Sequence, residues 1–182
     1  MSSFDITVPG TVMSKLDTLR PYGATSIYDA VAATSRELTT QGPRRAIVAL
    51  TDGGDNASKL TPEVVSGIAS SIDVPVYIVV VVSPLDKSGD TVLDEPALDA
   101  VMHGRLADLA HWTGGEIFAA IGPAQASATA RQIITELRQE YWLAFEPGSA
   151  PGWHTLEVRT RHKDLVVRAR SGYMVQAPGT ER

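Results

Sequence analysis

Two short motifs carry the side chains that could do chemistry. Thr25 lies in Gly23-Ala24-Thr25-Ser26-Ile27-Tyr28-Asp29-Ala30, and Asp52 lies in Leu50-Thr51-Asp52-Gly53-Gly54. A hydroxyl and a carboxylate are oxygen ligands of the kind that hard divalent cations bind. Thr25 precedes a helical pattern, and Asp52 directly follows an apolar run. Because ligands gather at the carboxyl ends of strands in open α/β sheets, we expect both side chains at one sheet edge, sharing one ion or its waters.

Each of these residues also has a simpler interpretation. Thr25 or Ser26 could cap the helix that follows, and Asp52 could be a turn residue before two glycines. Other residues could add to a metal site. Within or beside the two motifs these are Ser26, Gly53 and Asp55, and after the apolar run 76–82 they are Asp86 and Asp90.

The acidic segment after the run 76–82 has two interpretations. The spacing Asp86-x-Ser88-x-Asp90, with Asp94 and Glu95 nearby, could bind Ca²⁺ weakly. A solvated surface loop is the simpler explanation, because connecting segments run over the protein surface.

Motifs of covalent catalysis are absent from the sequence. It has no Gly-x-Ser-x-Gly, no phosphate loop ending in Gly-Lys-Ser/Thr, no His-Glu-x-x-His and no cysteine. His103 and His111 are eight residues apart, which does not place them together on a helix face as zinc ligands. We therefore expect a binding protein rather than an enzyme, and a metal-assisted hydrolase that uses Asp52 and the segment 86–95 is a disfavoured alternative.

The elements that must position Thr25 and Asp52 alternate along the chain. Residues 46–50 and 76–82 are continuous, apolar and rich in β-branched side chains, as in strands covered on both faces, and residues 116–121 form a third such segment. Helical periodicity marks 27–38, a segment from Thr61-Pro62-Glu63, 98–110 before Gly114-Gly115, and 123–140 with Ile133, Ile134 and Leu137 inward. This order predicts an α/β fold with a doubly wound, mostly parallel, Rossmann-like sheet.

The last forty residues change character. Residues 141–146, 153–160 and 165–175 read as three antiparallel strands with one buried face. We expect the core of this extension to be filled by aromatic residues, namely Tyr141, Trp142, Phe145 and Trp153. We expect its solvated face to be a row of arginines that could attract an acidic partner, namely Arg159, Arg161, Arg168 and Arg170. The expected organisation is an α/β domain over 1–140, antiparallel strands over 141–176 packed on the same domain, and a frayed tail over 177–182.

Charge and hydropathy restrict the partners. A formal net charge of −5 argues against a general nucleic-acid binder. The longest apolar run, 74–82, is too short to span a bilayer, and no signal peptide is visible at Met1. The sequence does not identify the cellular compartment of the protein.

The two motifs together resemble the von Willebrand factor type A family. The segment Leu109-Ala110…Thr113-Gly114-Gly115 and the segment Glu136-Leu137-Arg138…Tyr141 are similar to a bacterial subgroup called VWFA-related domains, whose members are often exported. The resemblance implies a metal-ion-dependent adhesion site that holds Mg²⁺ or another divalent cation. It implies Thr25 as the threonine ligand and Asp52 as an aspartate acting through water. The implied function is protein binding or adhesion, in which an acidic side chain of the partner completes the metal shell.

The sequence departs from the family pattern at its beginning. The family's Asp-x-Ser-x-Ser loop occurs nowhere in the chain. Phe4–Val8 and Val12–Leu19 look like the family's third strand and the following helix, so the first strand, first helix and second strand would be missing. We therefore expect an α/β domain that is incomplete at the N-terminus, with an incomplete metal site and an open apolar edge beside 46–50. A fragment, or a structural half-domain that contributes to a larger assembly, would explain that edge.

Overall fold

The fold is seen in a computed structural model that describes Ser14, Thr18 and residues 23–40, 45–71, 73–82, 95–141 and 143–175. Several expectations concern residues outside this set: the strand 4–8, the helix 12–19 apart from Ser14 and Thr18, Asp86 and Asp90, Trp142 and the tail 177–182.

Three parallel strands form the central sheet. They are β1 (Ile47–Thr51), β2 (Val76–Val82) and β3 (Ile117–Ile121), in the spatial order β1-β2-β3. The register sets Ile47 opposite Val76 and Ile78 opposite Ile117. The continuous apolar run of β2 is buried on both faces over its first five residues, as the middle strand of such a sheet requires. The three predicted strands are confirmed to within one residue at each end.

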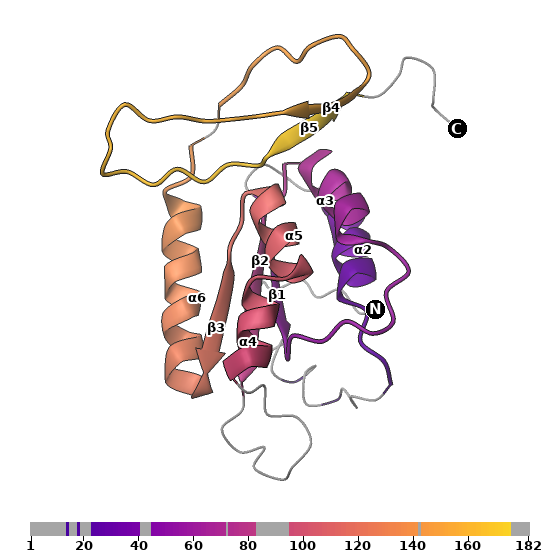
Figure 1. The fold of residues 1–182 in the computed structure, drawn as a ribbon, viewed down its shortest axis with the longest axis vertical. Coiled ribbons are helices and arrows are strands. Elements are labelled where there is room, and N and C mark those ends of the chain that lie inside the picture. The colour runs from indigo at the N-terminus through magenta and orange to yellow at the C-terminus, as the bar shows by residue number, and fades with distance from the viewer. Residues whose placement is uncertain are drawn as a thin grey trace.

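Helices cover both faces of this sheet. On one face, α2 (Ile27–Leu38), α3 (Pro62–Ser71), α4 (Glu95–Met102) and α5 (Arg105–Thr113) enclose the larger core around Val76, Ile78 and Val80. On the other, α6 (Gly122–Arg138) packs against β2 and β3 around Tyr77 and Val79 (Figure 1). The α/β class with helices on both faces of a parallel sheet is confirmed.

Two helix predictions need correction. The helix expected over 98–110 is two helices, since α4 ends at Met102 and α5 begins at Arg105. The break lies at Gly104, where a Cβ atom would come within 2.5 Å of the Ala100 carbonyl oxygen. In α6, Ile133 is buried but Ile134 is 48% exposed, because successive helical residues point about 100° apart.

The predicted stop of the third helix is confirmed. Gly114 takes a left-handed conformation (φ 86°), and its N–H bonds to the carbonyl oxygens of Ala110 and His111. A Cβ atom on the next residue, Gly115, would overlap the carbonyl of Val76. The pair of glycines thus ends α5 and lets the chain pass close to β2.

The C-terminal extension, residues 141–175, differs from the prediction and is called the arm below. Two strands form its sheet, β4 (Gly152–Thr155) and β5 (Gly172–Val175), paired antiparallel, where three strands were expected. Pairing continues only as far as a bond from Leu156 N–H to the Ser171 carbonyl oxygen. The described part of 141–146 is not a strand, and it meets the ribbon only through side chains, as Phe145 does at Tyr173.

The predicted aromatic core of the arm is wrong for the residues that the structure describes. Tyr141, Phe145 and Trp153 are exposed at 91%, 45% and 43%. The Phe145 ring meets the Tyr173 ring edge to face, and the His154 ring stacks on Tyr173 with 5.1 Å between the ring centroids. A two-stranded ribbon does not build a core of its own, so these rings stay exposed.

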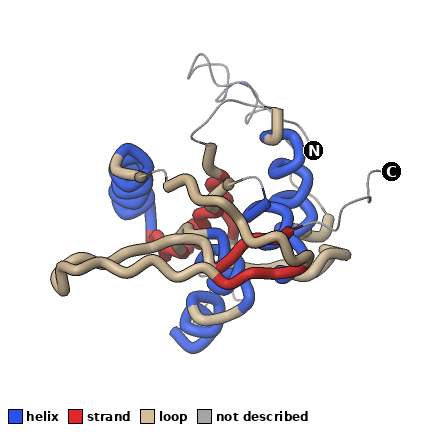
Figure 2. Tube along the Cα trace, turned by 90° about the horizontal axis from the view of Figure 1, so that it is seen from above, coloured by secondary structure: helices blue, strands red, loops and turns tan. Residues whose placement is uncertain are grey.

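The arm lies across the amino end of the parallel sheet (Figures 1 and 2). Arg168 reaches Glu116, which directly precedes β3, and Ser171 N–H bonds to the Trp112 carbonyl oxygen at 3.0 Å. These contacts place the arm at the edge opposite Asp52, which directly follows β1. The arm therefore leaves the carboxyl ends of the strands uncovered.

Candidate functional site

Thr25 lies directly against the loop that follows β1. Its backbone N–H bonds to Asn56 Oδ1 at 2.8 Å, and its carbonyl oxygen accepts bonds from the N–H groups of Asn56 and Ala57, both at 3.0 Å. The loop begins at Asp52, at the carboxyl end of the strand. The structure thus brings the segment of Thr25 and the loop of Asp52 to the same sheet edge.

Asp55 caps helix α2 from the neighbouring loop. Its Oδ2 accepts bonds from the N–H groups of Ile27 (2.7 Å) and Tyr28 (3.1 Å) and from the Ser58 hydroxyl (2.7 Å). Ser26 occupies the cap position without a side-chain bond to the helix, so the prediction that Thr25 or Ser26 supplies the cap is wrong. No local pattern predicts this role, because Asp55 lies 28 residues from Ile27.

The capping bonds determine the charge state of Asp55. Partial burial alone would raise its pKa, but the hydrogen bonds from Ser58, Tyr28 and Ile27 outweigh that effect and hold the pKa below its ordinary value of 3.8. Asp55 therefore stays an anion at the positive end of α2, where the helix dipole favours negative charge.

A second carboxylate fastens the same loop. Asp29 accepts bonds from the N–H groups of Lys59 and Leu60, at 3.1 and 2.9 Å, and its own N–H bonds to the Ser58 hydroxyl at 3.2 Å. Asp29 and Asp55 are thus occupied in holding the loop on the helix. Their oxygens serve the positioning of the edge rather than a ligand.

Asp52 and Thr25 keep free oxygen atoms at this edge. Asp52 is exposed, and its Oδ1 accepts a bond from Gly54 N–H at 3.2 Å and a long contact from the Thr51 hydroxyl. Neither Asp52 Oδ2 nor the Thr25 hydroxyl makes a hydrogen bond with a described residue. These are the atoms that the sequence nominated as ligands.

Gly53 fixes the start of the loop. It adopts φ +98°, a conformation that side chains disfavour, and a Cβ atom there would lie 3.2 Å from Val101 Cγ1 and 3.4 Å from Val80 Cγ1. Its N–H bonds to the Thr51 hydroxyl at 3.0 Å. The glycine lets the chain turn sharply after β1 while packing against α4.

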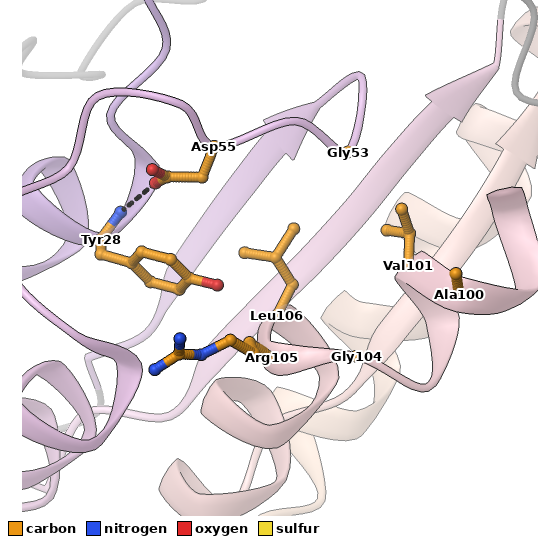
Figure 3. A pocket seen from close by; sticks show the side chains of 8 residues that line it. All are labelled: Tyr28, Gly53, Asp55, Ala100, Val101, Gly104, Arg105 and Leu106. Atoms are coloured by element: carbon orange, nitrogen blue, oxygen red, sulfur yellow. Dashed lines mark hydrogen bonds between the residues drawn. The ribbon is translucent and has the colours of Figure 1, made fainter.

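A cavity of about 310 Å³ opens beside this loop. It is lined by residues of the loop, of α2 and of the α4–α5 junction: Tyr28, Gly53, Asp55, Ala100, Val101, Gly104, Arg105 and Leu106 (Figure 3). Burial raises the pKa of Tyr28, the carboxylate of Asp55 raises it further, and Arg105 opposes the change. The Tyr28 hydroxyl is therefore a neutral donor and acceptor in this cavity.

The described residues offer few ligands to a metal ion. No group of three or more His, Asp or Glu side chains among them is arranged to hold one. Asp52 and Thr25 supply one carboxylate and one hydroxyl, and Asp86 and Asp90 lie outside the described residues. Such a pair suits Mg²⁺, which commonly keeps several waters and takes only one or two carboxylates from the protein.

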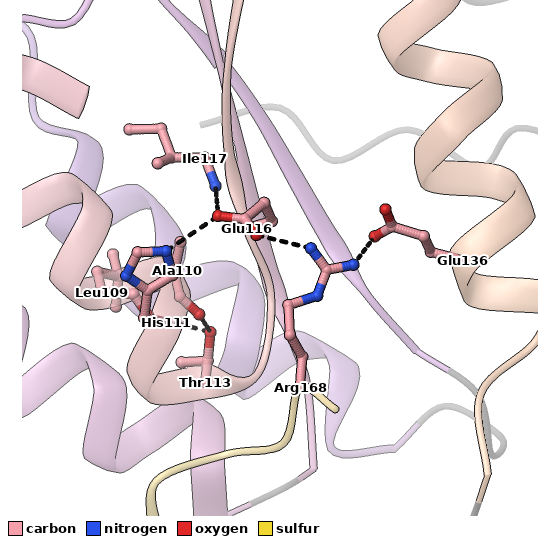
Figure 4. A network of polar contacts seen from close by, with 8 residues as sticks. All are labelled: Leu109, Ala110, His111, Thr113, Glu116, Ile117, Glu136 and Arg168. Carbon is pink, nitrogen blue, oxygen red and sulfur yellow. Dashed lines mark hydrogen bonds and ion pairs between the residues drawn. The ribbon is translucent and has the colours of Figure 1, made fainter. Parts of the chain in front are cut away.

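A polar network holds the arm at the opposite edge. Arg168 bonds to Glu116 Oε2 at 2.7 Å and to Glu136 of α6, and His111 Nε2 lies 2.9 Å from Glu116 Oε1 (Figure 4). Partial burial would raise the pKa of Glu116, but the bonds from His111 and Arg168 outweigh it and lower the pKa. Glu116 therefore faces Arg168 as a carboxylate at neutral pH.

The solvated arginine row was wrong for two of its members. Arg168 pairs with Glu116 and Glu136, and Arg170 pairs with Asp73 and donates to the Ser70 carbonyl oxygen at 2.5 Å. Burial raises the pKa of nearby Tyr77 to about 12, with Glu136 contributing. Local spacing could not predict the Arg168 pairs, because the partners Glu116 and Glu136 are 52 and 32 residues away.

No protein-family model and no curated protein sequence matches the chain. Among solved structures, it is similar to the conserved hypothetical protein BatB from Bacteroides thetaiotaomicron, with 17% identity and a TM-score of 0.50 over 71% of this chain and 69% of that one. A membrane-spanning protein from Vibrio fischeri is matched at 22% identity and a TM-score of 0.38, over 70% of this chain and 65% of that one. The first similarity supports the α/β fold. In the part of this chain that the structure describes, no helix combines the length and apolar character needed to cross a membrane.

Proposed function

We propose that the chain is a protein-binding module whose binding surface is the carboxyl edge of its sheet. A divalent cation, held by Asp52, Thr25 and waters, would be bound there, and an acidic side chain of the partner would complete its shell. The proposal rests on the hydrogen bonds between Thr25 and Asn56, which hold two backbone segments together. That contact brings the Thr25 segment onto the Asp52 loop.

The charge at this edge supports a cation. Asp55 and Asp29 are consumed by backbone N–H groups, so Asp52 is left with an oxygen free for an ion. With a single protein carboxylate near it, the bound ion keeps most of its positive charge and attracts a carboxylate from outside. Two protein ligands give weak binding, which we expect in the millimolar range that such sparse sites show.

The metal claim is tested by calorimetric titration with Mn²⁺, comparing the wild type with Asp52→Asn and Asp164→Asn. Asp164 lies in the arm and loses the same charge, so it is the matched control. We expect Asp52→Asn to lose the binding isotherm and Asp164→Asn to keep it. Equal Mn²⁺ binding by all three proteins would remove Asp52 from the site.

The partner claim needs a second measurement. Binding of an acidic peptide, followed by fluorescence anisotropy, should rise when Mn²⁺ is added to the wild type and should not respond to Mn²⁺ in Asp52→Asn. Peptide binding that is indifferent to the metal would contradict the bridging role of the cation.

A second candidate function, structural assembly, rests on the exposed side of β1. Within the described residues β1 pairs only with β2, and α6 packs on β2 and β3. Val48 and Leu50, whose side chains point to the α6 face of the sheet, are 43% and 71% exposed. An uncharged apolar edge strand of this kind favours pairing with another chain.

Size-exclusion chromatography with light scattering tests the assembly candidate. We expect an oligomer that Leu50→Glu dissociates and that Val64→Glu, which alters an exposed valine on α3, leaves intact. A wild-type protein that stays monomeric at high concentration would contradict this second function and leave the first untouched.

A further inference from the structure

The hairpin between β4 and β5 presents aliphatic side chains at its turn. Val166 is 94% exposed, Leu165 59% and Val167 41%. The turn closes with a bond from Leu165 N–H to the His162 carbonyl oxygen at 3.3 Å. We call residues 161–167 the hairpin tip. Aliphatic groups so fully exposed on a turn cost solvation free energy unless something covers them.

Basic side chains flank these aliphatic groups. Arg161 and Lys163 make no ion pair with a described residue, whereas Arg159 is already paired with Glu157 at 2.7 Å. Asp164 is the single acid of the tip. The arm as a whole carries five Lys or Arg against three Asp or Glu, in a chain whose net charge is −5. The arm therefore has a formal net charge of +2, whereas the rest of the chain has −7.

The tip projects from the body of the protein. Both views show the turn extending beyond α6 (Figures 1 and 2). The base of the arm is fixed by the Arg168 pairs and by the bond from Ser171 to Trp112. The tip can therefore meet a flat surface while the carboxyl edge, at the other end of the sheet, stays accessible.

We propose that the hairpin tip docks on an anionic lipid surface, with Leu165 and Val166 inserted at the boundary of the headgroups and Arg161 and Lys163 against the phosphates. A folded protein partner would need a shaped apolar patch with aromatic anchors. The tip offers three aliphatic side chains on a convex turn, which a fluid bilayer can accommodate without matching its shape. Basic residues beside inserted apolar groups are what an anionic bilayer attracts.

Co-sedimentation with vesicles tests the proposal, in the presence of EDTA so that no divalent cation takes part. The probes are vesicles of phosphatidylcholine alone and vesicles that also contain phosphatidylglycerol. We expect binding to the second kind only, weakened by high salt because the attraction is partly electrostatic. Each cation lost in Arg161→Gln or Lys163→Gln should lower the partition coefficient about fivefold. Val166→Asp should lower it about tenfold or more, since it loses an inserted group and adds like charge.

Matched variants separate insertion from general charge effects. Val64→Asp changes an exposed valine on α3, and Arg131→Gln removes an exposed cation on α6, and both should bind as the wild type does. Val166 is almost fully exposed, so Val166→Asp should keep the native circular dichroism spectrum and melting temperature. Absence of wild-type binding to the anionic vesicles, or undiminished binding by Val166→Asp, would overturn the proposal. Binding to polyglutamate but not to vesicles would also overturn it, in favour of an acidic protein.

Discussion

At the scale of single residues, Gly53 shows how the site depends on backbone conformation. We predict that Gly53→Ala lowers the free energy of unfolding by about 1–3 kcal/mol, because it combines a positive φ with contacts to Val101 and Val80 at 3.2–3.4 Å. Gly67→Ala is the control, since a Cβ atom on this helical glycine meets nothing within 4 Å. It should raise stability by about 1 kcal/mol. Urea denaturation of both variants measures this, and equal effects would contradict the role given to Gly53.

Asp55 makes a second prediction, on pH. Removing the cap in Asp55→Ala should cost about 1 kcal/mol of unfolding free energy at neutral pH. The folded pKa lies below 3.8, so the contribution of the charge is fully present above that value and is lost as the pH falls through the lowered folded pKa. The wild type and the variant should therefore converge in urea midpoint in strong acid. Asp164→Ala, in the exposed turn of the arm, should follow the wild type throughout.

At the scale of elements, the link between arm and body depends on Arg168. We predict that Arg168→Gln speeds amide hydrogen exchange at Ser171 about fivefold, which corresponds to about 1 kcal/mol for a partly exposed charged pair, and leaves the amides of β2 protected. Arg159→Gln is the control, because its partner Glu157 lies within the arm itself. A uniform acceleration that includes β2 would mean that the arm and the sheet unfold as one unit.

The same link should respond to acid. The pKa of Glu116 is lowered below 4.5, so its bond to Arg168 is fully formed above that pH and is lost as the pH falls through the lowered value. In the wild type, exchange at Ser171 should therefore accelerate in acid beyond the intrinsic pH effect. Glu116→Gln should show no such additional acceleration.

The elements differ in how far the sequence predicts them. Continuous apolar runs identify β1, β2 and β3, and β2 is buried on both faces as such a run predicts. The run of β1 predicts the strand but not its covering, since Val48 and Leu50 are exposed. Alternation of Leu156 with Glu157 and of Val167 with Arg168 predicted longer strands in the arm than the four residues of β4 and of β5. Alternation requires a covering layer to become a sheet face, and the described part of 141–146 does not provide one.

At the scale of the whole molecule, the sequence predicts the edge that bears the candidate site but not the hydrogen bonds that build this edge. Thr25 and Asp52 were nominated from their motifs, and the structure joins the Thr25 segment to the Asp52 loop through Asn56. The cap from Asp55 and the pairs of Arg168 join residues 28 to 52 positions apart. Such pairs depend on the packing of several elements, which local spacing cannot report.

The two ends of the parallel sheet therefore have different roles in this account. The arm and its ion pairs cover the amino end, and the carboxyl end presents free oxygens of Asp52 and Thr25 beside a cavity. On our two proposals, the acidic body would bind a cation and a protein partner, and the more basic arm would bind lipid. Failure of one proposed surface would leave the other standing, since the two lie at opposite ends of the sheet and are tested with different variants.

Anomalous diffraction from crystals soaked in Mn²⁺ would show whether Thr25 and Asp52 serve one shared cation. We expect an anomalous peak at the carboxyl edge, bonded to the Thr25 hydroxyl and reaching Asp52 directly or through one water. A peak that contacts only one of the two side chains, or oxygens of Thr25 and Asp52 too far apart for a single ion and its waters, would contradict it.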